Sequence, residues 1–205
     1  MASYVSRIPT PPRVLTEAEQ ATLLSVTGEH RAGFRDHMII ALALGTAARE
    51  HEIAGLDVGD VIDAGGAIKT RVFLRVFKQS ASKPVDQVLY LNRTLRTKLD
   101  RLLVWKKRNG ESVAPDAPLF VSRKGNRLST RQMRTMFKNW QQRAGFARLY
   151  NFHQLRHSAL SNCQRNTGDL TVTRLIARHT DVRTTQIYQH PSPEQLADAA
   201  DGMFC

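Results

Sequence analysis

The sequence changes once from helical to strand periodicity and back, and this single change sets the fold class. Apolar residues alternate with polar or aromatic ones in residues 67–77, where Val72, Leu74 and Val76 fall on one side, and residues 85–91 continue the strand character. Two such runs joined by a short turn predict an antiparallel hairpin. We therefore expect an α+β fold that is mainly α-helical and contains one small antiparallel β-hairpin or sheet.

The remaining segments have helical spacing and recognisable start signals. Thr16 and Glu19 form a capping box for a helix that runs to about Val26. Spacing and caps predict further helices in residues 31–45, 50–56, 93–108, 129–143, 153–165, 169–177, 182–189 and from 192 onwards.

Length and composition fit one folded domain. The chain has 205 residues, of which 41% are hydrophobic, and this is enough to form one core. Pro9, Pro11 and Pro12 exclude a helix at the start of the chain. We expect residues 1–15 to form an extended arm and residues 16–205 to form the domain.

The charge of the chain points to a polyanionic partner. Thirty Lys and Arg residues against eighteen Asp and Glu residues give a formal net charge of +12, which favours a nucleic acid over a merely soluble basic protein. Cys163 and Cys205 are too few for a disulfide scaffold, and the longest apolar run, residues 38–44, is too short to cross a bilayer. We expect a cytoplasmic protein without a membrane partner.

Five separated motifs carry side chains that suit chemistry on a phosphate. They are Thr46-Ala47-Ala48-Arg49-Glu50-His51-Glu52-Ile53, Lys78 after the alternating run, His153-Gln154-Leu155-Arg156, Ala177-Arg178-His179, and Thr184-Thr185-Gln186-Ile187-Tyr188-Gln189-His190. His153 and Arg156 are three residues apart on an expected helix, so both can reach one ligand. The guanidinium of an arginine such as Arg49 or Arg156 can bind two oxygens of one phosphate at the same time, without a metal or other cofactor.

In content and spacing, these motifs resemble the tyrosine recombinase (phage integrase) family over roughly residues 15–190. The resemblance implies the fold of the family's catalytic domain and an enzyme that cuts and rejoins DNA. Tyr188 would attack the scissile phosphate, form a 3′-phosphotyrosine link and release a 5′-hydroxyl. Arg49 and Arg156 would hold the phosphate, His153 would accept the tyrosine proton, and His179 would hydrogen-bond a phosphate oxygen.

The resemblance also assigns supporting roles. A lysine on the hairpin turn would protonate the leaving 5′-oxygen; Lys78 fits this position best, and Lys83 is the alternative. Glu52, three residues after Arg49, would orient the site. His157 and His190 are expected to be neighbours of catalytic residues rather than catalysts themselves.

The chain departs from the family's pattern at two glycines and in length. The family's Thr-Gly-Leu-Arg reads Thr46-Ala47-Ala48-Arg49, and its Leu-Gly-His reads Ala177-Arg178-His179, so the backbone geometry there is in question. The core-binding domain that precedes the catalytic domain in many members is not expected in residues 1–15. The sequence fits either a naturally short recombinase or a catalytic fragment.

The leading interpretation is a site-specific recombinase of double-stranded DNA, working as a homo-tetramer on synapsed sites with possible accessory proteins. In the family, the segment after the tyrosine packs against a neighbouring subunit; residues 192–204 are expected either to do this or to cap the core of their own chain. One alternative is a type IB-like nicking-closing topoisomerase. Another is a non-catalytic DNA-binding regulator that holds phosphates through residues such as Arg123, Lys124 and Arg127.

Overall fold

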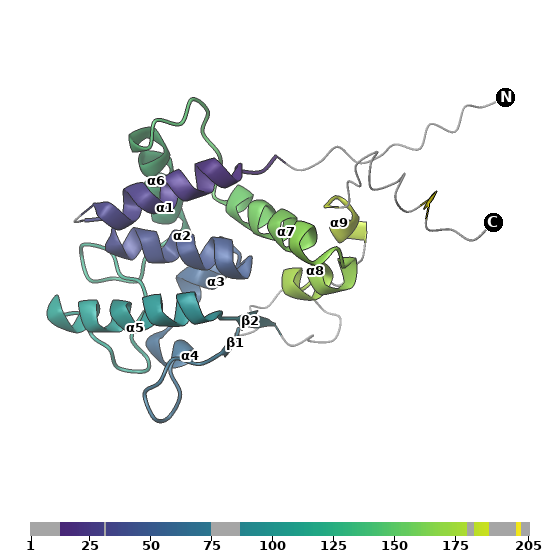
Figure 1. The fold of residues 1–205 in the computed structure, drawn as a ribbon. Helices are drawn as coiled ribbons and strands as arrows, with labels where there is room; N and C mark the ends of the chain where they lie inside the picture. The colour runs from purple at the N-terminus through teal and green to yellow at the C-terminus, as the bar shows by residue number, and fades with distance from the viewer. Residues whose placement is uncertain (1–12, 31, 75–86, 180–182, 189–199, 202–205) are drawn as a thin grey trace.

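The computed structural model describes residues 13–30, 32–74, 87–179, 183–188 and 200–201, and the structural statements below concern these residues (Figure 1). Helices dominate, and the two strands form one antiparallel sheet, which confirms the predicted fold class. The elements in chain order are α1 (Glu17–Glu29), α2 (Phe34–Thr46), α3 (Glu50–Gly55), α4 (Val58–Val61), β1 (Arg71–Phe73), β2 (Val88–Tyr90), α5 (Arg93–Arg108), α6 (Thr130–Arg143), α7 (His153–Thr167), α8 (Leu170–Ala177) and α9 (Arg183–Gln186).

Side-chain caps fix the starts of several helices. Thr16 and Ser129 complete capping boxes at α1 and α6, and Asn92 and Asp169 cap α5 and α8 by accepting backbone N–H groups. Helix α1 continues to Glu29, past the expected end, and α2 begins three residues later than expected. Helix α4 was not predicted, because its four residues are too few to show a helical period.

The predicted hairpin is present, but its strands are short. Val72 pairs with Leu89 at the centre of the ladder, and these two residues face the core. The strand expected over residues 67–77 breaks at its start because Ile68 forms an isolated bridge with Ile62 instead. The predicted turn, which includes Lys78 and Lys83, lies outside the described residues, as do the predicted arm up to residue 12 and, apart from the helical residues 200–201, the helix expected from residue 192 onwards.

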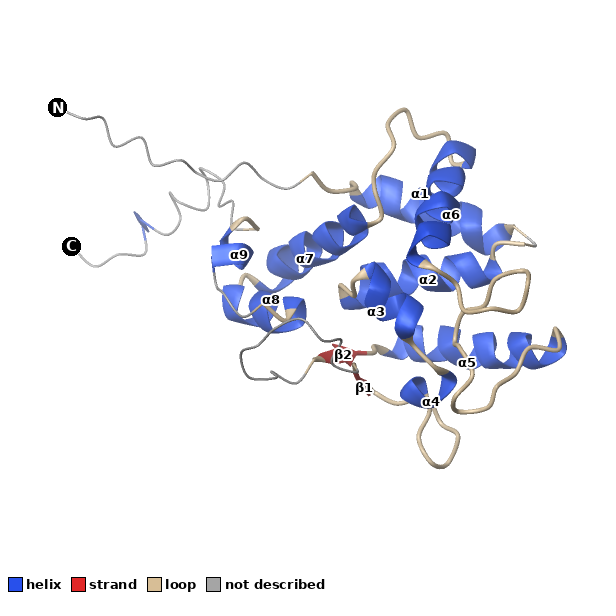
Figure 2. Cartoon of the chain, turned by 180° about the vertical axis from the view of Figure 1, so that it is seen from behind, coloured by secondary structure: helices blue, strands red, loops and turns tan. Residues whose placement is uncertain are grey.

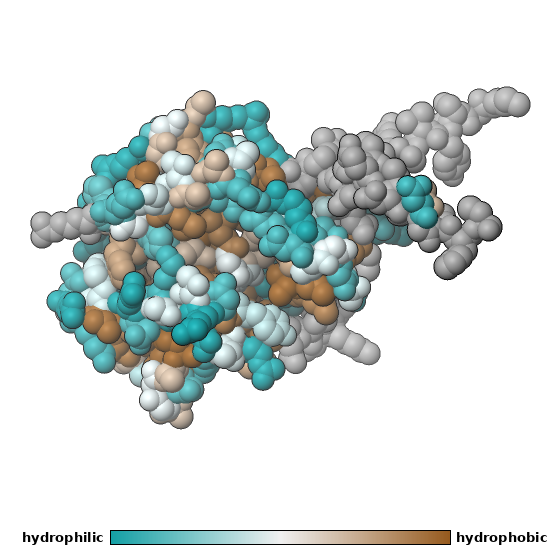
Figure 3. All heavy atoms as spheres, in the orientation of Figure 1, coloured by the Kyte–Doolittle hydropathy of each residue, from teal (hydrophilic) through white to brown (hydrophobic). Residues whose placement is uncertain are grey.

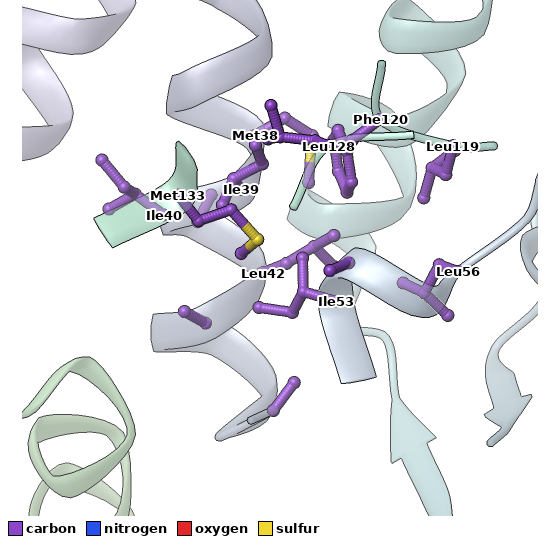
Figure 4. Packing of buried hydrophobic residues seen from close by; sticks show 14 of the residues in the cluster. Met38, Ile39, Ile40, Leu42, Ile53, Leu56, Leu119, Phe120, Leu128 and Met133 are labelled. Atoms are coloured by element: carbon purple, nitrogen blue, oxygen red, sulfur yellow. The ribbon is translucent and has the colours of Figure 1, made fainter. Parts of the chain in front are cut away.

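Helix α2 lies at the centre of the main core and packs against α1, α5 and α7. Almost its whole surface is buried between Met38 and Ala43. Figure 4 shows side chains of α2 meeting those of α3, α6 and the segment before α6: Met38, Ile39, Ile40, Leu42, Ile53, Leu56, Leu119, Phe120, Leu128 and Met133. Burying each large apolar side chain contributes about 2 kcal/mol, so this contact holds the helices in place.

A second, smaller core lies where α7, α8 and α9 meet, on one side of the molecule (Figures 1 and 2). We call it the second core, and its buried members are Ala47, Ala159, Leu160, Ala177 and Tyr188. Four of them are aliphatic, and three of those are alanines. The largest side chain of the second core is therefore that of Tyr188, for which the family resemblance implies the role of nucleophile.

No helix in the described part of the chain is long and apolar enough to cross a membrane. On the face seen in Figure 3, hydrophobic residues are visible as separate patches among hydrophilic ones. The largest exposed apolar side chains include Phe73 and Tyr90 on the hairpin and Leu175 on α8.

Candidate active site

The fold brings five of the six residues predicted as catalytic to the second core and its edge. Helix α7 begins with His153 and carries Arg156, and Arg49 is the residue before α3. His179 follows α8, and Tyr188 follows α9. Because α7 packs against α2 and α8, and α8 packs against α9, these separated motifs converge. The sixth predicted residue, Lys78, and its alternative Lys83 lie outside the described residues.

Arg156 is the centre of the site. Its guanidinium is buried and donates from Nη1 to the carbonyl of Ala47, from Nη2 to the carbonyl of Ala177 at 2.5 Å, and from Nη2 towards Nε2 of His179 at 3.1 Å. Burial, followed by the charges of Arg49 and Arg178, lowers the pKa of Arg156 to about 9. The group therefore stays cationic at neutral pH, and its orientation is fixed from two sides.

The two positions where the family's glycines are missing keep a left-handed backbone. Ala47 has φ of 53° and Arg178 has φ of 56°, and they are the two non-glycine residues with positive φ in the described ranges. Each costs about 1 kcal/mol relative to a right-handed residue. The turns at these positions present the Ala47 and Ala177 carbonyls to Arg156. The chain thus adopts a backbone conformation that favours glycine without a glycine at either position.

His179 links Arg156 to the helix that precedes the tyrosine. Its Nδ1 lies 3.0 Å from the hydroxyl of the buried Thr185, whose carbonyl accepts the backbone N–H of Tyr188. Burial, with Arg156 as the next cause, lowers the pKa of His179 to about 4. The imidazole is therefore neutral at pH 7, and Nε2 can accept from Arg156 while Nδ1–H donates to Thr185.

The hydroxyl of Tyr188 contacts His157 rather than His153. Nδ1 of His157 lies 2.7 Å from the Tyr188 oxygen, and the rings of His153 and His157 meet edge to face at 4.7 Å. Burial raises the pKa of Tyr188 to about 12 and lowers the pKa of His157 to about 4. At neutral pH the tyrosine hydroxyl therefore keeps its proton and donates a hydrogen bond to an uncharged imidazole.

His157 is the contact that the sequence interpretation missed, because it expected His153 to face the tyrosine. The signal was available: His157 lies four residues after His153 on α7, and this spacing places the two side chains on the same side of the helix, as the spacing of three does for Arg156. His153 is the most exposed of the three, and its pKa is lowered by partial burial and by the charges of Arg156 and Arg49.

Glu52 lies beside Arg49, as the sequence predicts, and it has a second cationic partner. It accepts from the backbone N–H of Arg49 at 2.6 Å, from Nη1 of Arg49 at 2.8 Å and from Nη2 of Arg178 at 2.6 Å. Burial alone raises the pKa of the Glu52 carboxyl, but the charge of Arg178 and the hydrogen bonds and charge of Arg49 outweigh it, so the pKa is lowered. The Arg178 contact was not predicted.

A basic groove of about 860 Å³ lies on another part of the described surface, between α6, the start of α2 and the turn at residues 122–124. Its acidic residue, Asp36, is already bound by Arg35 and by the indole N–H of Trp140. The cations along the groove are Arg35, Arg123, Lys124, Arg131 and Arg143. The groove therefore presents a positive surface to an anion.

Comparisons with known proteins identify the family of the chain. The family model described as "Phage integrase family" matches residues 13–195. Tyrosine recombinase XerC of Pseudomonas entomophila is 31% identical over 167 residues, which are 82% of this chain and 52% of that protein. XerC of Serratia marcescens is 28% identical over 93% of this chain and 59% of its own length. The chain thus spans little more than half the length of these relatives.

Solved recombinase structures share the fold. The XerA recombinase superposes with a TM-score of 0.73 and 25% identity, covering 94% of this chain and 65% of its own. XerH bound to its difH substrate also superposes with a TM-score of 0.73, at 22% identity and covering 95% of this chain and 55% of its own. With a family model matching most of the sequence and a fold shared with recombinases, the chain belongs to the phage integrase family.

Proposed function

We propose that the protein is a site-specific DNA recombinase that cleaves and rejoins DNA through a covalent link to Tyr188. The observation that carries the proposal is the hydrogen bond between the Tyr188 hydroxyl and the neutral His157, which directly follows the buried Arg156 on α7. The relatives named tyrosine recombinase XerC and the XerH structure with its difH substrate support it.

In the proposed cleavage step, the Tyr188 oxygen attacks the scissile phosphorus while the bond from phosphorus to the 5′-oxygen breaks. With a pKa of about 12, the hydroxyl is almost wholly protonated at neutral pH, so its proton must leave during the attack. Because Nδ1 of His157 lies 2.7 Å from the Tyr188 oxygen, we propose that it accepts this proton in place of His153. Lys78, or alternatively Lys83, protonates the leaving 5′-oxygen, and religation reverses every transfer.

Arg156 and Arg49 supply the positive charge. A guanidinium has five N–H donors, and the described contacts of Arg156 use one on Nη1 and both on Nη2. Two donors remain for the non-bridging oxygens of a phosphate. A preorganised donor of this kind lowers the barrier by about 3 kcal/mol. The neutral His179 accepts a hydrogen bond from Nη2 of Arg156 and so helps to hold this guanidinium in place.

The remaining parts of the proposal concern partners. The net charge of +12 and the basic groove suit double-stranded DNA, and we propose residues 16–205 as the catalytic domain. By analogy with the family, a homo-tetramer on synapsed sites, possible accessory proteins and a cytoplasmic location complete the proposal.

Covalent capture of DNA with random sequences tests whether Tyr188 forms a bond to DNA and, in the same experiment, identifies the DNA sequence that is cleaved. The protein is incubated with a library of nicked duplexes of random sequence, and DNA that stays attached in SDS is recovered and sequenced. We expect an adduct that Tyr188→Phe abolishes. Tyr150→Phe is the matched control, because Tyr150 also hydrogen-bonds through its hydroxyl, to Glu19. An adduct that persists in Tyr188→Phe would remove the nucleophile assignment.

The same library separates the alternatives. A topoisomerase would relax supercoiled plasmids that lack the captured sequence, and a regulator would bind DNA without forming any adduct. A recombinase would exchange strands between two copies of the captured site.

The general acid is tested with a substrate in which sulfur replaces the bridging 5′-oxygen. A thiolate leaves without a proton, so the variant lacking the acid should regain cleavage on this substrate. Lys78→Ala and Lys83→Ala are compared, and failure of both to recover would exclude both residues.

A further inference from the structure

Arg178 is a buried cation that the proposed chemistry does not use. It ends α8 in the left-handed conformation, and only 3% of its side chain is exposed. Nη2 binds Glu52 at 2.6 Å, Nη1 donates to the carbonyl of Ile176 at 3.2 Å, and Nε has no hydrogen-bond partner among the described residues. Burying a guanidinium with an unsatisfied N–H is unfavourable, so its pairing with Glu52 matters for the site.

Arg178 shares one carboxylate with Arg49. Nη1 of Arg49 binds Oε1 of Glu52, whereas Nη2 of Arg178 binds Oε2. Without Arg178, the negative charge of Glu52 would be balanced by Arg49 alone. Arg49 would then bring no net charge to a phosphate.

We infer that Arg178 is a positioning residue of the phosphate site, which neutralises Glu52 and so leaves the positive charge of Arg49 for the scissile phosphate. This inference rests on the proposed function. Exposure separates the two arginines: 30% of the Arg49 side chain is accessible, against 3% for Arg178. Arg49 can therefore touch a ligand, and Arg178 acts through Glu52.

The charge count of the site supports this role. Arg49, Arg156 and Arg178 with one carboxylate give a net charge of +2, while the imidazoles of His157 and His179 are neutral at pH 7. Attack on a phosphodiester produces a transition state with two negative charges on the phosphorus oxygens, which +2 balances. Loss of Arg178 lowers the count to +1.

A purely structural role is the competing explanation, because the ion pair also ties α8 to α3. The two roles differ in what a second substitution does. If Arg178 acts by neutralising Glu52, removing both charges restores the net charge of +2 from Arg49 and Arg156. If it acts only as a tie between helices, the tie stays broken, and any rate that the second substitution recovers should be equal on a charged and a neutral substrate.

The test measures single-turnover cleavage of the captured nicked duplex by wild type, Arg178→Gln, Glu52→Gln and the double variant. Arg178→Gln should cleave about 10- to 100-fold more slowly, the usual cost of losing a group that supports a direct ligand. The double variant should cleave at least tenfold faster than Arg178→Gln. A wild-type rate in Arg178→Gln, or no recovery in the double variant, overturns the inference.

A substrate with a neutral methylphosphonate at the scissile position provides the second readout. Its transition state carries one negative charge less, so the loss caused by Arg178→Gln should shrink at least fivefold relative to the phosphodiester. An equal loss on both substrates would assign Arg178 a structural role only.

The double variant decides the question if Arg178→Gln does not fold, because it removes both buried charges together. Cleavage of the phosphodiester within about tenfold of the wild-type rate supports the inference, since the net charge of +2 is kept. A greater loss that is equal on the phosphodiester and the methylphosphonate overturns it. Absence of any wild-type adduct would instead count against the proposed function.

Discussion

Mild acid should weaken the fold through His157 and His179. Both imidazoles have a pKa near 4 in the folded chain, chiefly because they are buried and secondarily because of neighbouring charges, against 6.5 for an ordinary histidine. Below pH 6.5 the unfolded chain therefore binds protons that the folded chain does not. Stability is fully present above pH 6.5 and is lost as the pH falls from 6.5 towards 4.

The magnitude follows from the two shifts. Each pH unit below 6.5 lowers the free energy of unfolding by about 1.4 kcal/mol per histidine. At pH 5 each histidine therefore lowers it by about 2 kcal/mol if the full pKa shift applies. Both rings keep some contact with solvent, and halving the values for screening leaves about 2 kcal/mol for the pair.

The assay is urea unfolding between pH 5 and pH 8, followed by circular dichroism, and it needs no DNA. Wild type should lose about 2 kcal/mol of unfolding free energy between pH 7 and pH 5 from these two groups, and His157→Gln and His179→Gln should each remove about half of that dependence. His51→Gln, which removes an exposed imidazole from α3, is the control. If both site variants keep the pH dependence of wild type, the reasoning about the neutral imidazoles is refuted.

Substitutions at three further positions test the packing and capping of the helices by urea unfolding. Lys106→Met should lower the free energy of unfolding by about 2 kcal/mol. The buried ammonium of Lys106 binds Glu111 at 2.8 Å, and removing it leaves the Glu111 carboxylate without this partner. An unchanged urea midpoint would contradict this. Ser129→Ala removes the cap of α6 and should cost about 1 kcal/mol, whereas Ser129→Asp should retain most of the stability. Gly33→Ala should cost about 1–3 kcal/mol, since the added Cβ would lie 2.2 Å from the carbonyl oxygen of Thr27, and a neutral effect would show that this turn can shift.

Local sequence signals predicted the helices well and the strands less well. Helix α5 has the predicted bounds because Leu95, Leu99 and Leu102 form an uninterrupted inward stripe behind the Asn92 cap. The strands are shorter than predicted, because alternation shows which residues can face a core but not how far a partner strand extends alongside them.

Contacts between distant residues limited the prediction of the site. Arg49, Arg156, His179 and Tyr188 were identifiable because their spacing follows a known pattern. The contact of His157 with Tyr188 joins residues 31 apart, and that of Arg178 with Glu52 joins residues 126 apart. These contacts depend on how α8 packs against α7 and α9 packs against α8. The spacing of residues within one segment does not determine this packing.

The packing of Tyr188 in the second core has a consequence for the balance between broken and sealed DNA. Only 6% of this residue is exposed, so a phosphate can reach its oxygen only when the ring shifts away from Leu160 and the alanines, which are too small to fill the space, while the oxygen stays beside Nδ1 of His157. The displaced ring forfeits about 2 kcal/mol of burial for as long as it remains bonded to DNA. Religation returns the ring to the core and recovers that energy. The proposed enzyme would therefore favour resealing over a lasting strand break, and amide hydrogens of α8 should exchange faster in the covalent adduct than in the free protein.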